Sequence, residues 1–95
     1  MNEPKPFVVV RTYSAGVHVG TLESRDGKEV VLSDARRVWY WQGANSLHEL
    51  ALCGADLKRG TRISEPVASI VLTEAIEVID TTEAAAENLR ISRWL

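Results

Sequence analysis

Short segments rich in β-branched and aromatic residues dominate the first half of the chain, and they constrain its fold more than any other feature. Such segments, bounded by Gly, Asp and Asn, are typical of β-strands. The Asp26-Gly27 pair favours a hairpin turn of two residues, and Ser33-Asp34 predicts a second short turn. The pattern therefore predicts an antiparallel meander of about four strands, over residues 7–13, 17–22, 30–32 and 35–41.

The second half of the chain predicts helices around further strands. Ser46 and Glu49 have the spacing of a helix capping box, and Gly54 is a suitable helix stop. Residues 62–64 predict a short strand. The apolar spacing of residues 67–80 fits a strand or a helix, but six Val or Ile residues favour a strand, broken near residues 73–74. Thr81 or Thr82 then caps a final helix.

The predicted fold class is α+β: an N-terminal antiparallel β-meander followed by a short helix, further strand(s) and a C-terminal helix. A chain of 95 residues with 45% apolar residues is typical of a single domain, here spanning 1–95. The single cysteine, Cys53, argues against a disulfide framework and a multi-cysteine zinc site, and it favours a reducing cytoplasmic location. The sequence has no apolar run of the roughly 18 residues that a membrane span needs.

The sequence shows no constellation of residues that predicts catalysis. Neither His18 nor His48 has a spacing that brings it to a nucleophile, and the two histidines lack the spacing of metal ligands. No glycine-rich phosphate loop of a known kind is present. We therefore expect a protein that is not an enzyme and needs no cofactor and no metal. The net charge of −2 argues against binding to duplex nucleic acid.

The densest feature is the segment over residues 36–46, which combines arginines with aromatic residues. In a strand, Arg37, Trp39 and Trp41 would project to one face, and Arg36, Val38 and Tyr40 to the other. A guanidinium fork beside flat rings suits a ligand with a phosphate and a base. The helix start at Asn45 and Ser46 offers free N–H groups to an anion, and Arg11 and Tyr13 lie on a neighbouring strand. From composition alone, the same aromatic residues favour a buried structural strand over a ligand pocket.

The C-terminal residues 91–95 carry an apolar pair, Trp94 and Leu95, where a chain end would normally fray. A tryptophan there predicts an anchor against the sheet or a second subunit. Because Trp and Arg are favoured at the centres of interfaces, we expect a homo-oligomer.

Three stretches resemble a known family: residues 10–20, residues 35–44 with the run Arg36-Arg37-Val38-Trp39-Tyr40-Trp41, and residues 72–77. They resemble a family of small phage and prophage proteins of unknown function, similar to the first type of Thoeris anti-defence proteins. Those phage proteins act as sponges, which sequester cyclic nucleotide signals such as cyclic ADP-ribose isomers and cyclic oligonucleotides without cleaving them. The resemblance implies an N-terminal antiparallel sheet followed by helices, assembly into dimers and up to hexamers, and pockets at subunit boundaries. The chain is shorter than some members of that family.

The leading expectation is therefore a phage anti-defence sponge that binds a cyclic nucleotide in the cytoplasm of an infected bacterial host. The alternative is a small phage structural or assembly protein that acts through protein–protein contacts. The expected partners are a cyclic nucleotide ligand and further copies of the chain, from dimer to hexamer, without a membrane. The candidate ligand-binding residues are Arg11, Tyr13, Arg36, Arg37, Trp39, Trp41, Asn45, Ser46, Arg90 and Arg93.

Overall fold

The computed structural model describes residues 5–14, 16–40, 46–55 and 62–91. It confirms the α+β class: an N-terminal antiparallel sheet, a short helix, further strands and a C-terminal helix. The elements are β1 (Phe7–Thr12), β2 (Val17–Asp26), β3 (Glu29–Tyr40), α1 (Leu47–Cys53), β4 (Arg62–Ile63), β5 (Val67–Leu72), β6 (Ala75–Asp80) and α2 (Glu83–Ile91).

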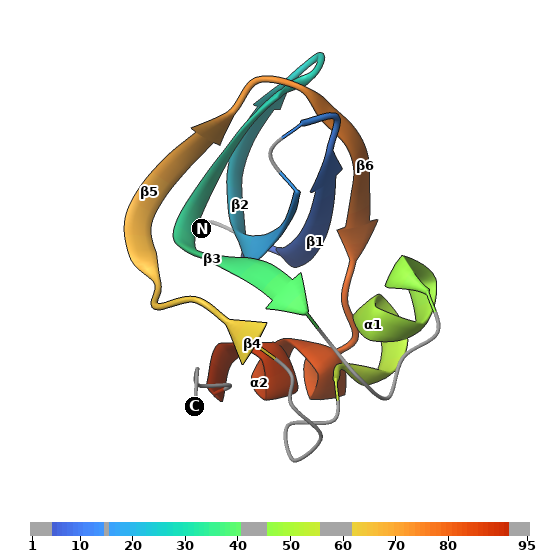
Figure 1. Cartoon of the computed structure of the whole chain (residues 1–95). Coiled ribbons are helices and arrows are strands. Elements are labelled where there is room, and N and C mark those ends of the chain that lie inside the picture. Colours follow the sequence, from blue (N-terminus) through green and yellow to red (C-terminus); the bar gives the residue numbers. More distant parts are fainter. Residues whose placement is uncertain (1–4, 15, 41–45, 56–61, 92–95) are drawn as a thin grey trace.

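The strands form one six-stranded antiparallel sheet with the order β4-β3-β2-β1-β6. β5 also pairs with β3, beside its N-terminal part, whereas β4 pairs with the C-terminal end of β3. β5 lies on the β3 side of the sheet and β6 at the opposite end, yet only two residues connect them. The sheet therefore curls into an open barrel, with both helices below it (Figure 1).

The turn predicted at Ser33-Asp34 is wrong, because β3 continues through both residues. Thr21 of β2 pairs with Ser33, whereas Val19 pairs with Arg36, so β3 holds one extra residue at this point. This is a β-bulge, and Asp34 adopts the left-handed conformation there, with φ of 48°. Aspartate tolerates that conformation, and pairing with β2 and β5 on the two edges of β3 keeps the strand in one piece. The meander thus has three strands rather than four.

Two apolar cores lie on the two faces of the curled sheet. The core inside the barrel contains Val8, Val10, Val30, Leu32, Ala35 and Leu72. The core between the sheet and the helices contains Phe7, Val9, Val19, Val38, Leu50, Ala51, Ala55, Ile63, Ala86 and Leu89. β1 contributes alternate residues to both cores, so both of its faces are buried, and this explains its uninterrupted apolar run.

Local capping signals fix both ends of α1 and the start of α2, as the sequence predicts. The Ser46 hydroxyl accepts a hydrogen bond from the Glu49 N–H at 3.2 Å. At the other end of α1, Gly54 has a φ of 76° and its N–H donates to the Leu50 carbonyl at 2.8 Å. Thr82 caps α2, because its hydroxyl accepts from the Ala85 N–H at 3.1 Å. Within the described ranges, neither helix is long and apolar enough to cross a membrane.

Candidate functional site

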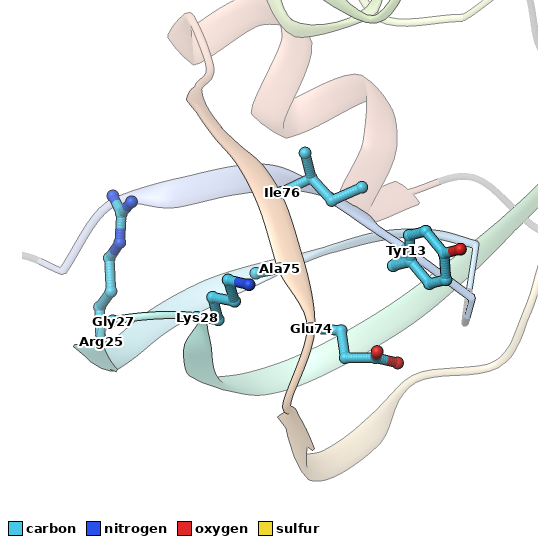
Figure 2. A pocket seen from close by; sticks show the side chains of 7 residues that line it. All are labelled: Tyr13, Arg25, Gly27, Lys28, Glu74, Ala75 and Ile76. Atoms are coloured by element: carbon cyan, nitrogen blue, oxygen red, sulfur yellow. The ribbon is translucent and has the colours of Figure 1, made fainter.

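A pocket of about 570 Å³ opens at the end of the barrel where β1 and β5 end and β6 begins. Figure 2 shows its lining side chains, which come from three segments that are distant in the sequence. They are Tyr13 after β1, residues 25–28 around the β2–β3 turn, and residues 74–76 at the start of β6. Ligand pockets in proteins span about 300–1,000 Å³, so the size suits a small-molecule ligand.

Backbone hydrogen bonds hold the three segments together. The Tyr13 N–H donates to the Glu74 carbonyl at 3.0 Å, and the Ala75 N–H donates to the Lys28 carbonyl at 3.0 Å. The Ser14 hydroxyl donates to the Glu74 carboxylate at 2.9 Å. Gly27 has a φ of 60°, so the β2–β3 turn is tight and sits where the sequence predicts a turn. The residues at the start of β6 thus hold the segment after β1 on one side of the pocket and the β2–β3 turn on the other.

The pocket presents two cations and an exposed ring. Arg25 and Lys28 are exposed, and neither forms an ion pair with any residue that the structure describes. Arg11, in contrast, pairs with Glu77 at 3.3 Å. The Tyr13 side chain is 78% exposed and the apolar Ile76 is 52% exposed. Cations and a flat ring that line one pocket are the kinds of group that bind a phosphate and stack a base.

Arg36 lies elsewhere and has a structural role. Its side chain is buried, with Nε donating to the Ser64 carbonyl at 2.7 Å. Its Nη1 donates to the Leu89 and Arg90 carbonyls at 3.1 and 2.8 Å. These carbonyls lie in the last turn of α2, where the helix itself offers them no partner. The guanidinium therefore fastens the C-terminal end of α2 to the sheet.

Arg37 points to the opposite face of β3, as the alternation predicts, and is exposed. Its Nε lies 3.4 Å from Nε2 of His18. The two residues line a second, smaller pocket, separate from that at Tyr13.

Of the remaining predicted residues, Arg90 lines a further pocket together with Arg36. The Arg90 guanidinium lies over the Phe7 ring, 4.7 Å from its centre, and the Ser46 hydroxyl is occupied by its cap. Trp39 lies on β3, but its side chain is outside the described part of the chain, as are the residues Trp41, Asn45 and Arg93. Among the predicted residues whose side chains are described, Tyr13 is the one that lines the larger pocket.

Sequence reasoning missed Arg25, Lys28 and Glu74. Residues 25–28 predict a turn. The one local signal that could have marked a binding site is the pair of basic residues that flank Gly27, with Arg25 before it and Lys28 after it. Nothing local indicates that this turn meets Tyr13 and the start of β6, because those contacts depend on how the whole sheet curls.

Comparisons with known proteins give one family. The family model described as "Domain of unknown function (DUF6948)" matches residues 5–89. No curated protein and no solved structure matches the chain. The match covers both walls of the pocket and nearly all of the fold, so the chain belongs to the DUF6948 family, a family of unknown function.

Proposed function

We propose that this protein binds a cyclic nucleotide signal, a cyclic ADP-ribose isomer or a cyclic oligonucleotide, and sequesters it without cleaving it. The observation that carries the proposal is the pocket lined by the exposed Tyr13 ring and by two cations, Arg25 and Lys28, that form no ion pair with a described residue. The resemblance of residues 10–20, 35–44 and 72–77 to the Thoeris anti-defence sponges supports it. On this proposal, the protein works in the cytoplasm of an infected bacterial host.

Binding in this pocket requires no reaction. Arg25 supplies a planar fork of donors and Lys28 a mobile point charge, and both suit phosphate oxygens. Each hydrogen bond to a charged group stabilises a complex by roughly 1.5–3 kcal/mol. Tyr13 and Ile76 offer surface against which a base packs. Base stacking on an aromatic side chain contributes about 1–3 kcal/mol, so the three contacts together support tight binding.

A thermal-shift panel tests binding and its site. The panel contains cyclic di- and trinucleotides and cyclic ADP-ribose isomers. A ligand present at 100 times its Kd stabilises the fold by about 2.7 kcal/mol. We expect Lys28→Gln to lose most of this shift. Lys5→Gln is the matched control, because Lys5 pairs with Glu23 outside this pocket, and it should keep the shift. A panel without any shift would contradict the proposal.

Recovery of the ligand tests sequestration against cleavage. After binding, the protein is denatured by heat and the released ligand is analysed by chromatography. We expect the full bound amount to return chemically unchanged. Linear or monomeric products that increase with time would show turnover and overturn the proposal.

A second candidate function is a small phage structural or assembly protein. The specific observation in its favour is the set of exposed apolar side chains Leu52, Val67, Val71 and Ile76, which are 50–60% exposed. Exposed apolar surface often marks contact with another protein. The same side chains fit the homo-oligomer that we propose for the sponge. A defined oligomer that binds no member of the panel would favour the structural function.

A further inference from the structure

The pocket at Tyr13 also contains one acidic side chain, that of Glu74. Both residues are exposed and line the pocket, and the Tyr13 N–H donates to the Glu74 carbonyl at 3.0 Å. In the view of Figure 2, the Tyr13 ring and the Glu74 carboxylate lie on one side of the start of β6, and Arg25 and Lys28 lie on the other. The pocket is therefore cationic at the β2–β3 turn and acidic at the end that follows β1.

This separation of charge favours one orientation of a bound nucleotide. A phosphate next to Glu74 would bring like charges together, which is unfavourable, so we expect the phosphates at Arg25 and Lys28. The base is then expected at the other end, against the Tyr13 ring. Proteins recognise unstacked bases by stacking them on an aromatic side chain and by hydrogen bonds to the Watson–Crick edge.

The Glu74 carboxylate is held in place and still has acceptor sites to offer. The Ser14 hydroxyl donates to its Oε1 at 2.9 Å, whereas a carboxylate has about four lone-pair sites on its two oxygens. Within the described ranges, no cation forms an ion pair with Glu74. An ionised carboxylate accepts hydrogen bonds and donates none, so Glu74 favours a group that presents donors.

The Watson–Crick edges of the bases differ in the donors that they present. Guanine has two adjacent donors, N1–H and the N2 amino group, which match the two oxygens of a carboxylate. Adenine and cytosine each have an amino group next to an unprotonated ring nitrogen, whose lone pair would face the carboxylate. Uracil has one N–H between two carbonyl oxygens. Because hydrogen bonds to an ionised acceptor are strong, guanine fits Glu74 best.

We infer that Glu74 is a specificity-determining residue, which selects guanine as the base that packs against Tyr13. Its carboxylate accepts from guanine N1–H and the N2 amino group, while the Ser14 hydroxyl holds Oε1. This selectivity rests on the proposed function and narrows it. The ligand is a cyclic oligonucleotide that contains guanine, rather than a cyclic ADP-ribose isomer, whose base is adenine.

Three cyclic dinucleotides with different base edges test this selectivity by isothermal titration. We expect cyclic di-GMP to bind about tenfold more tightly than cyclic di-IMP, which lacks the N2 amino group. It should bind at least about a hundredfold more tightly than cyclic di-AMP, which loses both contacts. Cyclic di-AMP that binds as tightly as cyclic di-GMP would overturn the inference.

A single variant tests whether Glu74 is the residue that selects the base. Glu74→Gln keeps an acceptor for the Ser14 hydroxyl, but the amide offers one acceptor and one donor, the pair that adenine matches. We expect the preference for guanine over adenine to fall at least about tenfold. Glu87→Gln, the same change on the exposed side of α2, should keep the native preference. An unchanged preference in Glu74→Gln would contradict the inference.

The linear mononucleotides GMP and AMP separate this inference from the proposed function. Their binding is measured by shifts of the backbone ¹⁵N resonances of residues 13, 74 and 76, and we expect GMP to bind at least about tenfold more tightly than AMP. That preference without binding of any cyclic nucleotide would refute sequestration and leave the role of Glu74 supported. Cyclic nucleotides that bind without preference for guanine would refute the role of Glu74 alone. Absence of binding by GMP and by every cyclic nucleotide would overturn both.

Discussion

Arg36 and Arg37 are adjacent in the sequence, but they have opposite environments because side chains alternate along a strand. Arg36 is buried against the end of α2, and Arg37 is exposed beside His18. The alternation is visible in the sequence. The sequence does not show which of the two faces of β3 meets α2, because that depends on contacts between β3 and a helix more than 50 residues away.

The two arginines should therefore differ in their effect on stability. Arg36→Ala removes the hydrogen bonds to the Ser64, Leu89 and Arg90 carbonyls. It should lower the free energy of unfolding by roughly 3 kcal/mol. Arg37→Ala, at an exposed position, should change it by about 0.5 kcal/mol. Urea unfolding of both variants measures the difference, and equal losses would refute the structural role of Arg36.

The buried His18 predicts a pH dependence of stability. Its pKa is lowered in the folded chain, by burial first and then by Arg37, from the ordinary value of 6.5. As the pH falls below about 6.5, the unfolded chain takes up a proton and the folded chain does not, so stability falls. The loss is at most about 1.4 kcal/mol per pH unit, and it ends once the folded chain also takes up the proton.

Urea unfolding between pH 7.5 and pH 5 measures this slope. The lowered pKa of Glu23, due mainly to its hydrogen bond with Lys5, affects stability below the ordinary value of 4.5, outside that range. His18→Gln should flatten the slope, and His48→Gln on α1 should leave it in place. If His18→Gln does not fold, NMR titration of the native ring gives its pKa directly. A pKa at or above 6.5 would contradict the account.

At the scale of elements, local signals were sufficient where a local contact decides the structure. The cap at Ser46, the stop at Gly54, the cap at Thr82 and the break near residues 73–74 were all predicted and are confirmed. The turn at Ser33-Asp34 was wrong because strand pairing on both edges of β3 overrides a local preference. The pocket at Tyr13 was missed for a related reason. Arg25 and Lys28 line the same pocket as Tyr13 only because the sheet curls.

One side-chain amide, that of Asn88, connects the two helices in addition to the hydrogen bonds that Thr82 donates to the Ala51 and Leu52 carbonyls. The Asn88 side chain accepts from the Ala55 N–H and donates to the Ala55 carbonyl, both at 2.9 Å, and so joins α2 to the end of α1. Asn88→Asp keeps the acceptor but loses the donor, and it brings a carboxylate against the carbonyl oxygen. It should lower the free energy of unfolding by about 1–3 kcal/mol, whereas Glu87→Gln on the exposed side of α2 should change it little. Thermal unfolding compares the two, and an unaffected Asn88→Asp would refute this connection.

At the scale of the whole molecule, β5 is the surface most suited to contact between copies. It has no charged residue, Val67 and Val71 are 50% and 53% exposed, and β3 is the one described strand that pairs with it. An uncharged edge of this kind favours pairing with another strand. We expect a dimer or larger species by light scattering. Val71→Lys should shift the mass toward the 10.5 kDa monomer, whereas Ser24→Lys, at an exposed position of β2, should leave the mass unchanged. A native monomer would contradict the proposed assembly.

The central claim is that the pocket at Tyr13 holds a cyclic nucleotide through Arg25 and Lys28. Isothermal titration with the ligand that the panel identifies tests it most directly, on the native protein and on the Arg25→Gln/Lys28→Gln variant. Loss of two charge-assisted contacts should weaken binding at least about a hundredfold, with the melting temperature in the absence of ligand nearly unchanged because both side chains are exposed. An unchanged Kd in the double variant would contradict the claim.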